Sequence, residues 1–300
     1  MKDVLILGSD GKLGSGLMKK LEFRARGTTR RTDLLPNEIF LNLLDHESIQ
    51  NLKNESDYRF AIIVAAISDP DQCFVNQELS NLINVESTIK VLKILSENQI
   101  KPVFISTEMV FGGDRQFYSE LDKPEPALIY GKQKLQVENF IFDNFDDFLI
   151  LRLSKMYSSH INDKSILYTF FDDVFNNRTA MYAKDQYFSP TLQDDFETCV
   201  SELIENNLSG LFHISSNCRV SRWDLFEMFA NTIGNFGKVK PCLLSDIEFL
   251  ERRPMDLSLN SEKISKVLDF VFTTPRAGIE KWIKTNYSYI SNTIGLYEKN

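Results

Sequence analysis

The strongest constraint on the fold is the alternation of short strand-like segments with longer amphipathic stretches through the first half of the chain. Segments that predict strands, most of them apolar, lie at about residues 4–7, 24–29, 39–43, 61–66, 102–106 and 148–153. Helical spacing separates them, most clearly at Leu13, Leu17 and Leu21, over residues 79–95, and from Tyr130 onwards. Strands apolar on both faces and joined through helices are typical of a parallel sheet covered on both sides. The sequence therefore predicts an α/β fold with a doubly wound, Rossmann-like parallel sheet.

The second half of the chain has a looser pattern. Helices are predicted at about residues 166–175, 194–204 and 223–233, with a short strand at 210–214. A length of 300 residues is close to the limit for one hydrophobic core. We therefore expect a dinucleotide-binding Rossmann domain over residues 1–156. Residues 157–300 are expected to form mainly a smaller C-terminal α+β substrate-binding lobe, with some segments returning to the Rossmann domain.

Charge and cysteine content exclude several classes of protein. The chain carries 34 Lys and Arg against 42 Asp and Glu, a net charge of −8, which disfavours a surface for nucleic acid or anionic membranes. No apolar run approaches the length of a membrane-spanning helix, and the N-terminus lacks a signal-peptide core. The four cysteines and three histidines have no metal-ligand or disulfide-framework spacing. We expect a cytoplasmic protein with no metal site, nucleic-acid partner or membrane partner.

A glycine-rich loop at the end of the first predicted strand indicates a cofactor. Gly8, Gly11 and Gly14 have the spacing G-x-x-G-x-x-G between strand and helix, where glycines let the backbone approach a pyrophosphate. A glycine-rich turn without a ligand is the alternative, but the position directly after residues 4–7 favours dinucleotide binding. The residues expected to bind the cofactor here are Gly8, Asp10, Gly11, Lys12, Leu13 and Gly14.

Two arginines follow the second predicted strand, where folds that prefer NAD place an acidic residue. The segment reads Gly27-Thr28-Thr29-Arg30-Arg31. Two guanidinium groups suit a ribose 2′-phosphate, so Arg30 and Arg31 favour NADPH over NADH. The alternative is a pair of solvated surface arginines.

Tyr130 and Lys134 form a candidate catalytic pair. Residues four apart share a helix face, and a nearby cation is expected to lower the pKa of the tyrosine. A Tyr/Lys pair at this spacing is commonly just a solvated helix face. Here the hydroxyls of Ser106 and Thr107 end a predicted strand upstream, which favours catalysis.

Together these motifs resemble the extended short-chain dehydrogenase/reductase superfamily, and three further segments resemble its dTDP-4-dehydrorhamnose reductase family. Residues 106–111 resemble a Ser-Thr-Asp-Tyr-Val-Phe segment, and 185–191 resemble an Asp-Gln-x-x-x-Pro-Thr segment. Arg253-Pro254 with residues 259–263 resembles the Arg-Pro…Leu-Asn-x-Glu-Lys ending. The resemblance spans nearly the whole chain in the right order.

The resemblance implies NADPH-dependent reduction of the 4-keto group of a nucleotide-diphosphate deoxysugar, in activated-sugar biosynthesis. Tyr130 would protonate the developing alkoxide, Lys134 would hold the nicotinamide ribose, Thr107 would bind the keto oxygen and Glu108 would orient the sugar. Further cofactor contacts are expected from Asn42, Leu43, Ala65 and Ala66, and substrate contacts from Met109, Lys155, Gln186, Thr191 and Arg253. The partner is then a nucleotide-sugar substrate, and a homodimer is compatible with the resemblance.

The departures from the family pattern lie around the expected substrate pocket. Glu108 replaces an Asp, Met109 an aromatic residue and Lys155 a Trp. The Asn-Ala-Ala stretch of the family's fourth strand has become Ile-Val-Ala-Ala at residues 63–66. We expect a roomier, more polar pocket for which dTDP-4-dehydrorhamnose is not the best substrate. The alternative is that Lys155 points to solvent and Met109 fills the same volume as the aromatic residue.

Two rival functions stay open. One is a sugar-nucleotide epimerase or dehydratase that retains NAD, although a dehydratase needs adjacent Asp and Glu after the Thr, whereas Met109 follows Glu108 here. The other is a noncatalytic NADP-binding regulatory subunit, a role that relatives of the family serve for a methionine adenosyltransferase. Thr107, Tyr130 and Lys134 together favour catalysis.

Overall fold

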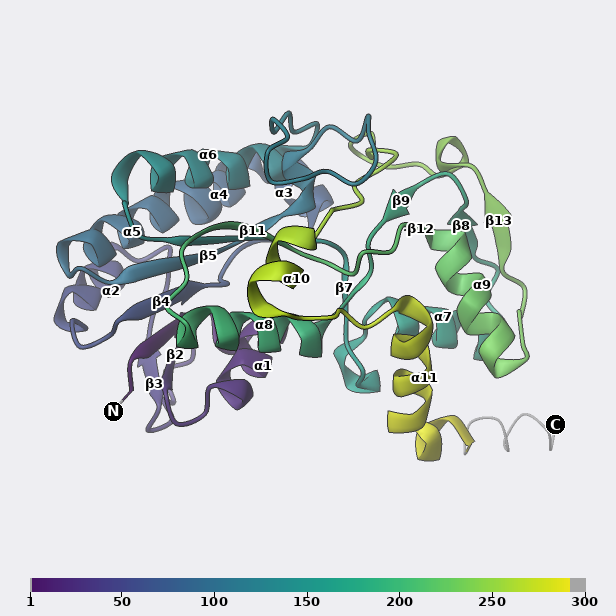
Figure 1. Ribbon diagram of the computed structural model, residues 1–300, viewed down its shortest axis with the longest axis horizontal. Coiled ribbons are helices and arrows are strands. Elements are labelled where there is room, and N and C mark those ends of the chain that lie inside the picture. The colour runs from purple at the N-terminus through teal and green to yellow at the C-terminus, as the bar shows by residue number, and fades with distance from the viewer. Residues whose placement is uncertain (1, 292–300) are drawn as a thin grey trace.

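The central feature is a seven-stranded parallel sheet in the order β11-β6-β5-β4-β1-β2-β3. The computed structural model describes residues 2–291 (Figure 1). The sheet consists of β1 (Val4–Leu7), β2 (Ala25–Thr29), β3 (Glu38–Phe40), β4 (Phe60–Ile63), β5 (Lys101–Thr107), β6 (Leu149–Leu153) and β11 (Gly210–Ile214). Its order reverses direction beside β1, as in doubly wound folds, which confirms the predicted fold class.

Helices cover both faces of this sheet (Figure 1). One face packs against α1 (Lys12–Lys20), α8 (Gln193–Glu205) and α10 (Glu262–Leu268), and the other against α2 (His46–Asn51), α5 (Thr88–Glu97) and α6 (Ile129–Asn144). In β1, Val4 and Ile6 join the first core, whereas Leu5 and Leu7 join the second. Burial on both faces therefore explains why the strands are continuously apolar rather than alternating.

The predicted single helix over residues 79–95 is divided in the structure. After α3 (Pro70–Val75) the chain forms α4 (Gln77–Asn81), a π-helical turn over Leu82–Ser87 and then α5. Within that turn the side-chain amide of Asn84 donates to the carbonyl oxygen of Ile67 at 2.9 Å and to Gln133 at 2.8 Å. Such wide turns are common where a helix presents a side chain for a specific contact.

A second core forms the lobe beside the sheet (Figure 1). Aromatic residues from α7 (Ile166–Phe175), α9 (Arg222–Ile233) and α11 (Pro275–Thr285) fill it, among them Phe170, Phe226, Phe229 and Trp282. Three two-stranded pairs complete it: β7 (Met156–Tyr157) with β10 (Thr191–Leu192), β8 (Met181–Ala183) with β13 (Lys240–Cys242), and β9 (Tyr187–Phe188) with β12 (Val220–Ser221). Within residues 2–291, no helix is both long and apolar enough to cross a membrane.

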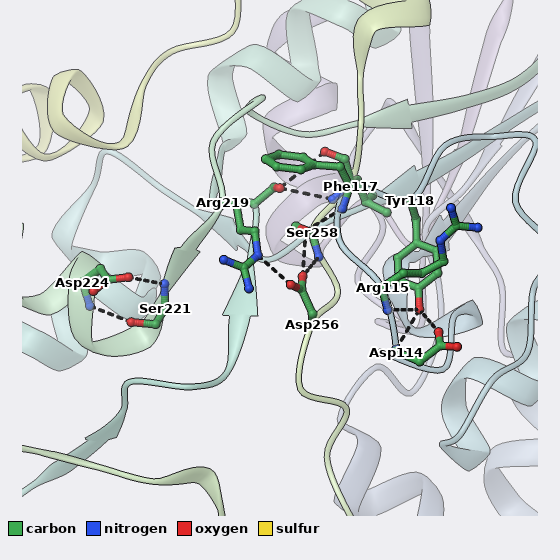
Figure 2. A network of polar contacts seen from close by, with 11 residues as sticks. Asp114, Arg115, Phe117, Tyr118, Arg219, Ser221, Asp224, Asp256 and Ser258 are labelled. Carbon is green, nitrogen blue, oxygen red and sulfur yellow. Dashed lines mark hydrogen bonds and ion pairs between the residues drawn. The ribbon is translucent and has the colours of Figure 1, made fainter.

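Segments from beyond residue 157 also complete the sheet. Strand β11 pairs in parallel with β6, and α8 packs against α1. A hydrogen bond connects the loop after β5 with the late chain, because Ser258 Oγ accepts from the Phe117 amide at 2.9 Å (Figure 2). Ser258 Oγ in turn donates to Asp256 at 2.7 Å, and Asp256 also accepts from Arg219 Nε at 2.6 Å. The lobe is thereby tied to the strand end that carries Thr107.

Candidate active site

Three adjoining cavities lie along the carboxyl ends of the strands. The central cavity, of about 530 Å³, is lined by the glycine loop, residues 105–109, Tyr130, Lys134, residues 153–158 and Arg222. The outer cavity, of about 280 Å³, adjoins it at Gly8, Gly11, Val64 and Ala66 and extends over residues 28–30 and 41–44. The lobe cavity, of about 370 Å³, shares Glu108, Met109, Lys155 and Arg222 with the central cavity and extends to Gln186 and Arg253. Ligands of open parallel sheets bind at this edge.

The glycine loop closes tightly against the sheet. Gly8 has φ +91°, and a Cβ there would lie 2.9 Å from the backbone nitrogen of Ala65. A Cβ on Gly14 would lie 2.1 Å from the Gly8 carbonyl oxygen, so both positions require glycine. Gly11 caps α1 without a side-chain hydrogen bond, and the first turn has no acidic residue. The exposed backbone N–H groups of this turn therefore fit the diphosphate of a dinucleotide.

The two arginines differ in whether they line the outer cavity. Arg30 lines it, together with Asp10, Asn42 and Leu43, and Asp10 accepts a hydrogen bond from Thr29 Oγ1 at 3.0 Å. Arg31 is not among the lining residues, because its guanidinium is 2.5 Å from Glu38. Of the two arginines, Arg30 lines the outer cavity and Arg31 does not.

Tyr130 and Lys134 both face the central cavity from α6. Lys134 Nζ donates to the Ile105 carbonyl oxygen at 2.8 Å and lies 5.9 Å from the centre of the Tyr130 ring. Burial lowers the pKa of Lys134 to about 8, although the negative charge of Glu138 acts to raise it.

The expectation that Lys134 lowers the pKa of Tyr130 is wrong for this structure. Burial raises the pKa of the Tyr130 phenol, and the charges of Cys73 and Glu108 add to the rise. The physical reason is that the phenol is removed from water, while the Lys134 ammonium is directed to a carbonyl oxygen instead of to the phenol. A phenol with a raised pKa stays protonated near neutral pH, as a proton donor must.

Thr107 and Glu108 lie at the end of β5, on the wall of the central cavity. Thr107 Oγ1 accepts from the Met109 amide at 3.2 Å, which begins a short 3-10 turn. Glu108 is 5% exposed, and burial raises its pKa to about 8 despite the opposing effects of the Ser154 hydroxyl and the Lys155 charge. Its Oε2 has no hydrogen-bond partner among the described residues. A carboxyl group that is neutral for much of the time can donate a hydrogen bond to a ligand.

A buried ion pair that the sequence analysis missed supports these residues from behind. Arg152 in β6 contacts Glu138 in α6 at 2.6 Å, and Ser106 in β5 donates to the same carboxylate. Arg152 and Glu138 are 2% and 0% exposed. The only signals were a charged residue inside an apolar strand and an acid one helical turn after Lys134. The pair and Ser106 thereby connect β6 with β5 and α6, the two elements that position the candidate catalytic groups.

The structure distributes four of the five expected substrate residues over the central and lobe cavities. Met109 and Lys155 line both the central and the lobe cavities, whereas Gln186 and Arg253 line the lobe cavity. Arg253 also contacts Asp71 at 2.8 Å.

Thr191 was expected to contact substrate, but the structure does not bring it to the site. It is fully buried in β10, donates to the Ser189 carbonyl oxygen at 3.0 Å, and lines none of the three cavities. The physical reason is that pairing of β10 with β7 turns this side chain into the protein.

Arg222 and Ser154 are cavity residues that the sequence analysis missed. Arg222 is the first residue of α9, after Ser221, whose hydroxyl accepts from the Asp224 amide at 3.0 Å while Asp224 accepts from the Ser221 amide at 2.8 Å (Figure 2). This capping box predicts a helix start. It does not show that the helix start faces the sheet.

The sheet is doubly wound, a glycine loop lies at a helix N-terminus, and a Tyr/Lys pair lies beside a strand that ends in hydroxyl residues. These features define a dinucleotide-binding protein of the short-chain dehydrogenase/reductase type. The chain belongs to the family described as RmlD substrate binding domain, which matches residues 1–288. The family and its structural neighbours include NAD(P)-dependent enzymes of sugar nucleotides, which supports a nicotinamide cofactor.

Two relatives show how far the sequence has diverged. The probable low-salt glycan biosynthesis reductase Agl14 of Haloferax volcanii is 30% identical over 220 residues, 71% of this chain and 73% of the relative. Methionine adenosyltransferase 2 subunit beta of Xenopus laevis is 26% identical over 233 residues, 74% of this chain and 69% of the relative.

Solved structures agree with the fold. A hypothetical dTDP-4-dehydrorhamnose reductase from Sulfolobus tokodaii has a TM-score of 0.80 at 26% identity, covering 92% of this chain and 98% of its own. The dTDP-4-dehydrorhamnose reductase from Bacillus anthracis in complex with NADP has a TM-score of 0.84 at 23% identity, covering 95% and 100%. MoeE5 in complex with UDP-glucuronic acid and NAD has a TM-score of 0.79 at 20% identity, covering 95% and 99%.

Proposed function

We propose that this protein reduces the 4-keto group of a nucleotide-diphosphate deoxysugar with NADPH. The observation that carries the proposal is the convergence of Thr107, Tyr130 and Lys134 on one cavity that continues into both the outer and the lobe cavities. A dinucleotide extending from the outer cavity and a nucleotide sugar extending from the lobe cavity would meet at these three residues. The named relatives include reductases, which is consistent with this reaction.

In the proposed mechanism, bound NADPH supplies a hydride to the keto carbon. Thr107 donates a hydrogen bond to the keto oxygen, and Tyr130 transfers its phenolic proton to that oxygen as charge develops. The raised pKa of Tyr130 keeps this proton in place before the reaction. Lys134 holds the nicotinamide ribose, and Glu108 orients the sugar by hydrogen bonding. Asp10, Arg30, Asn42 and Leu43 line the outer cavity and would hold the adenosine end, and Lys12 and Leu13 line the central cavity and would hold the diphosphate.

The deciding experiment is an assay of NADPH oxidation against a panel of nucleotide-linked 4-keto sugars, dTDP-4-dehydrorhamnose among them. Tyr130→Phe should lower turnover by about 100- to 10,000-fold, the usual contribution of general acid catalysis, while NADPH binding persists. Tyr287→Phe, at a tyrosine that is 66% exposed, is the matched control. Near-normal turnover of Tyr130→Phe would refute the assignment of Tyr130.

The similarity to methionine adenosyltransferase 2 subunit beta favours a second candidate, a noncatalytic NADP-binding regulatory subunit. The same assay separates the two functions. A wild-type protein that binds NADPH but turns over no member of the panel supports the regulatory candidate, because both functions share the cofactor site and only the reductase uses Tyr130 as an acid.

A further inference from the structure

Two cations from distant parts of the chain face the same space without a counter-ion. Lys155 follows the carboxyl end of β6 in the sheet, and Arg222 is the first residue of α9 in the lobe. Both line the central cavity and the lobe cavity. Within residues 2–291, neither side chain makes a hydrogen bond or an ion pair.

The backbone holds both residues in place. The Lys155 carbonyl oxygen accepts from the Thr191 amide at 3.0 Å, and the capping box at Ser221 fixes the start of α9 (Figure 2). Desolvation in the cavity lowers the pKa of Lys155 and the charge of Arg222 lowers it further, against the charges of Glu108 and Asp69. Like charges held together without a partner are unfavourable for the protein alone and favourable for an anionic ligand.

Among residues 2–291, the acidic residues that line these cavities form no ion pair with Lys155 or Arg222, although the charges of Glu108 and Asp69 oppose the lowering of the Lys155 pKa. Asp69 accepts from the Gln72 amide at 2.9 Å and caps α3, and Asp163 accepts from the Ser158 hydroxyl. Glu108 has a pKa of about 8 because of burial. The positive charge of Lys155 and Arg222 is therefore directed at the cavity.

The position of the pair indicates which part of the substrate it meets. Of the central and lobe cavities, Arg253 lines the lobe cavity alone, whereas Tyr130 and Lys134 line the central cavity alone. Lys155 and Arg222 line both and lie between them. In a nucleotide sugar, the sugar ring separates the diphosphate on its first carbon from the reacting carbonyl on its fourth. A ligand that places its carbonyl at Tyr130 and its diphosphate near Arg253 therefore places its sugar ring beside the cation pair.

We infer that Lys155 and Arg222 bind a carboxylate on the sugar ring, so that the 4-keto substrate is an acidic nucleotide-linked sugar in place of a neutral deoxysugar. The inference rests on the proposed function. A guanidinium donates two parallel hydrogen bonds to a carboxylate, and a lysine adds a compact charge.

The test compares ligands that differ only in the carboxylate. Dissociation constants are measured by calorimetry, with saturating NADP⁺, for UDP-glucuronic acid against UDP-glucose and for dTDP-glucuronic acid against dTDP-glucose. In the nucleotide series that binds, we expect the acidic member to bind at least tenfold more tightly. Lys155→Met and Arg222→Met should each reduce this ratio to about one, and Lys155→Arg should retain it. Lys132→Met, on the exposed surface of α6, is the matched control and should retain the full ratio.

The outcomes separate the inference from the function on which it rests. Equal affinity for the acidic and neutral members overturns the inference and leaves nucleotide-sugar binding supported. Loss of the preference in Arg253→Met, but not in Lys155→Met or Arg222→Met, assigns the carboxylate to Arg253 and also overturns it. If all four ligands fail to bind while NADP⁺ binds, the proposed function fails and the inference fails with it.

Discussion

Replacing Glu108 with Gln should change the pH dependence of folding stability. The pKa of Glu108 is raised from 4.5 to about 8, chiefly by burial, so the native protein binds a proton that the unfolded chain releases. The sign follows from linkage: stability is unaffected below the unfolded pKa, falls as the pH rises from 4.5 to about 8, and is constant above that. Gln cannot ionise and carries no such penalty.

The magnitude follows from the same two values. Between pH 5 and pH 9 the ionisation of Glu108 should lower the free energy of unfolding of the wild type by about 4 kcal/mol relative to Glu108→Gln. Urea unfolding of both proteins at several pH values measures this difference, and titrations shared by both proteins cancel. Glu248→Gln, at an exposed carboxylate, is the control. A difference between the wild type and Glu108→Gln that changes by less than about 1 kcal/mol across this range would refute the argument that burial holds the proton on Glu108.

The other predictions concern the cofactor and the buried ion pair. Arg30→Ala should raise the NADPH dissociation constant by about 10- to 150-fold, the loss of one charge-assisted hydrogen bond, and leave that of NADH nearly unchanged; equal NADPH affinity would contradict this. Arg31→Ala should have a smaller effect, because Arg31 is paired away from the outer cavity, and fluorescence titration measures both variants. Arg152→Met should lower the free energy of unfolding by about 3 to 5 kcal/mol, because it leaves Glu138 buried and unpaired. The double variant Arg152→Met/Glu138→Gln should recover part of this lost free energy of unfolding. If the double variant is no more stable than Arg152→Met, the loss comes from packing and not from the unpaired charge.

Local patterns predicted the parts of the site that belong to one segment of chain. Gly14 is required by its close approach to the carbonyl oxygen of Gly8 in the same loop, and Tyr130 with Lys134 share a face through helical spacing alone. The strand at residues 210–214 and the helix at 166–175 also coincide with β11 and α7, because their apolar periodicity is strong.

Features that depend on packing between distant segments were not predictable. Thr191 belongs to a recognisable motif, but the pairing of β10 decides which way its side chain points. Arg222 reaches the site only because the lobe folds against the end of the sheet. The pKa of Tyr130 has the opposite shift to the one expected, because desolvation depends on everything that surrounds the ring.

The net negative charge of the chain differs in sign from the charge of the residues that line its candidate site. A net charge of −8 argues against polyanions, whose binding depends on an extended positive field. The central cavity nevertheless concentrates cations over acids: it is lined by Lys12, Lys134, Lys155, Lys164 and Arg222, against Glu108 and Asp163. Because screening limits charge effects to about 8 Å at physiological salt, the surface charge contributes little inside a cavity. If Lys155 and Arg222 bind the sugar as proposed, selection of an anionic ligand depends on these few lining residues and not on the net charge of the whole chain.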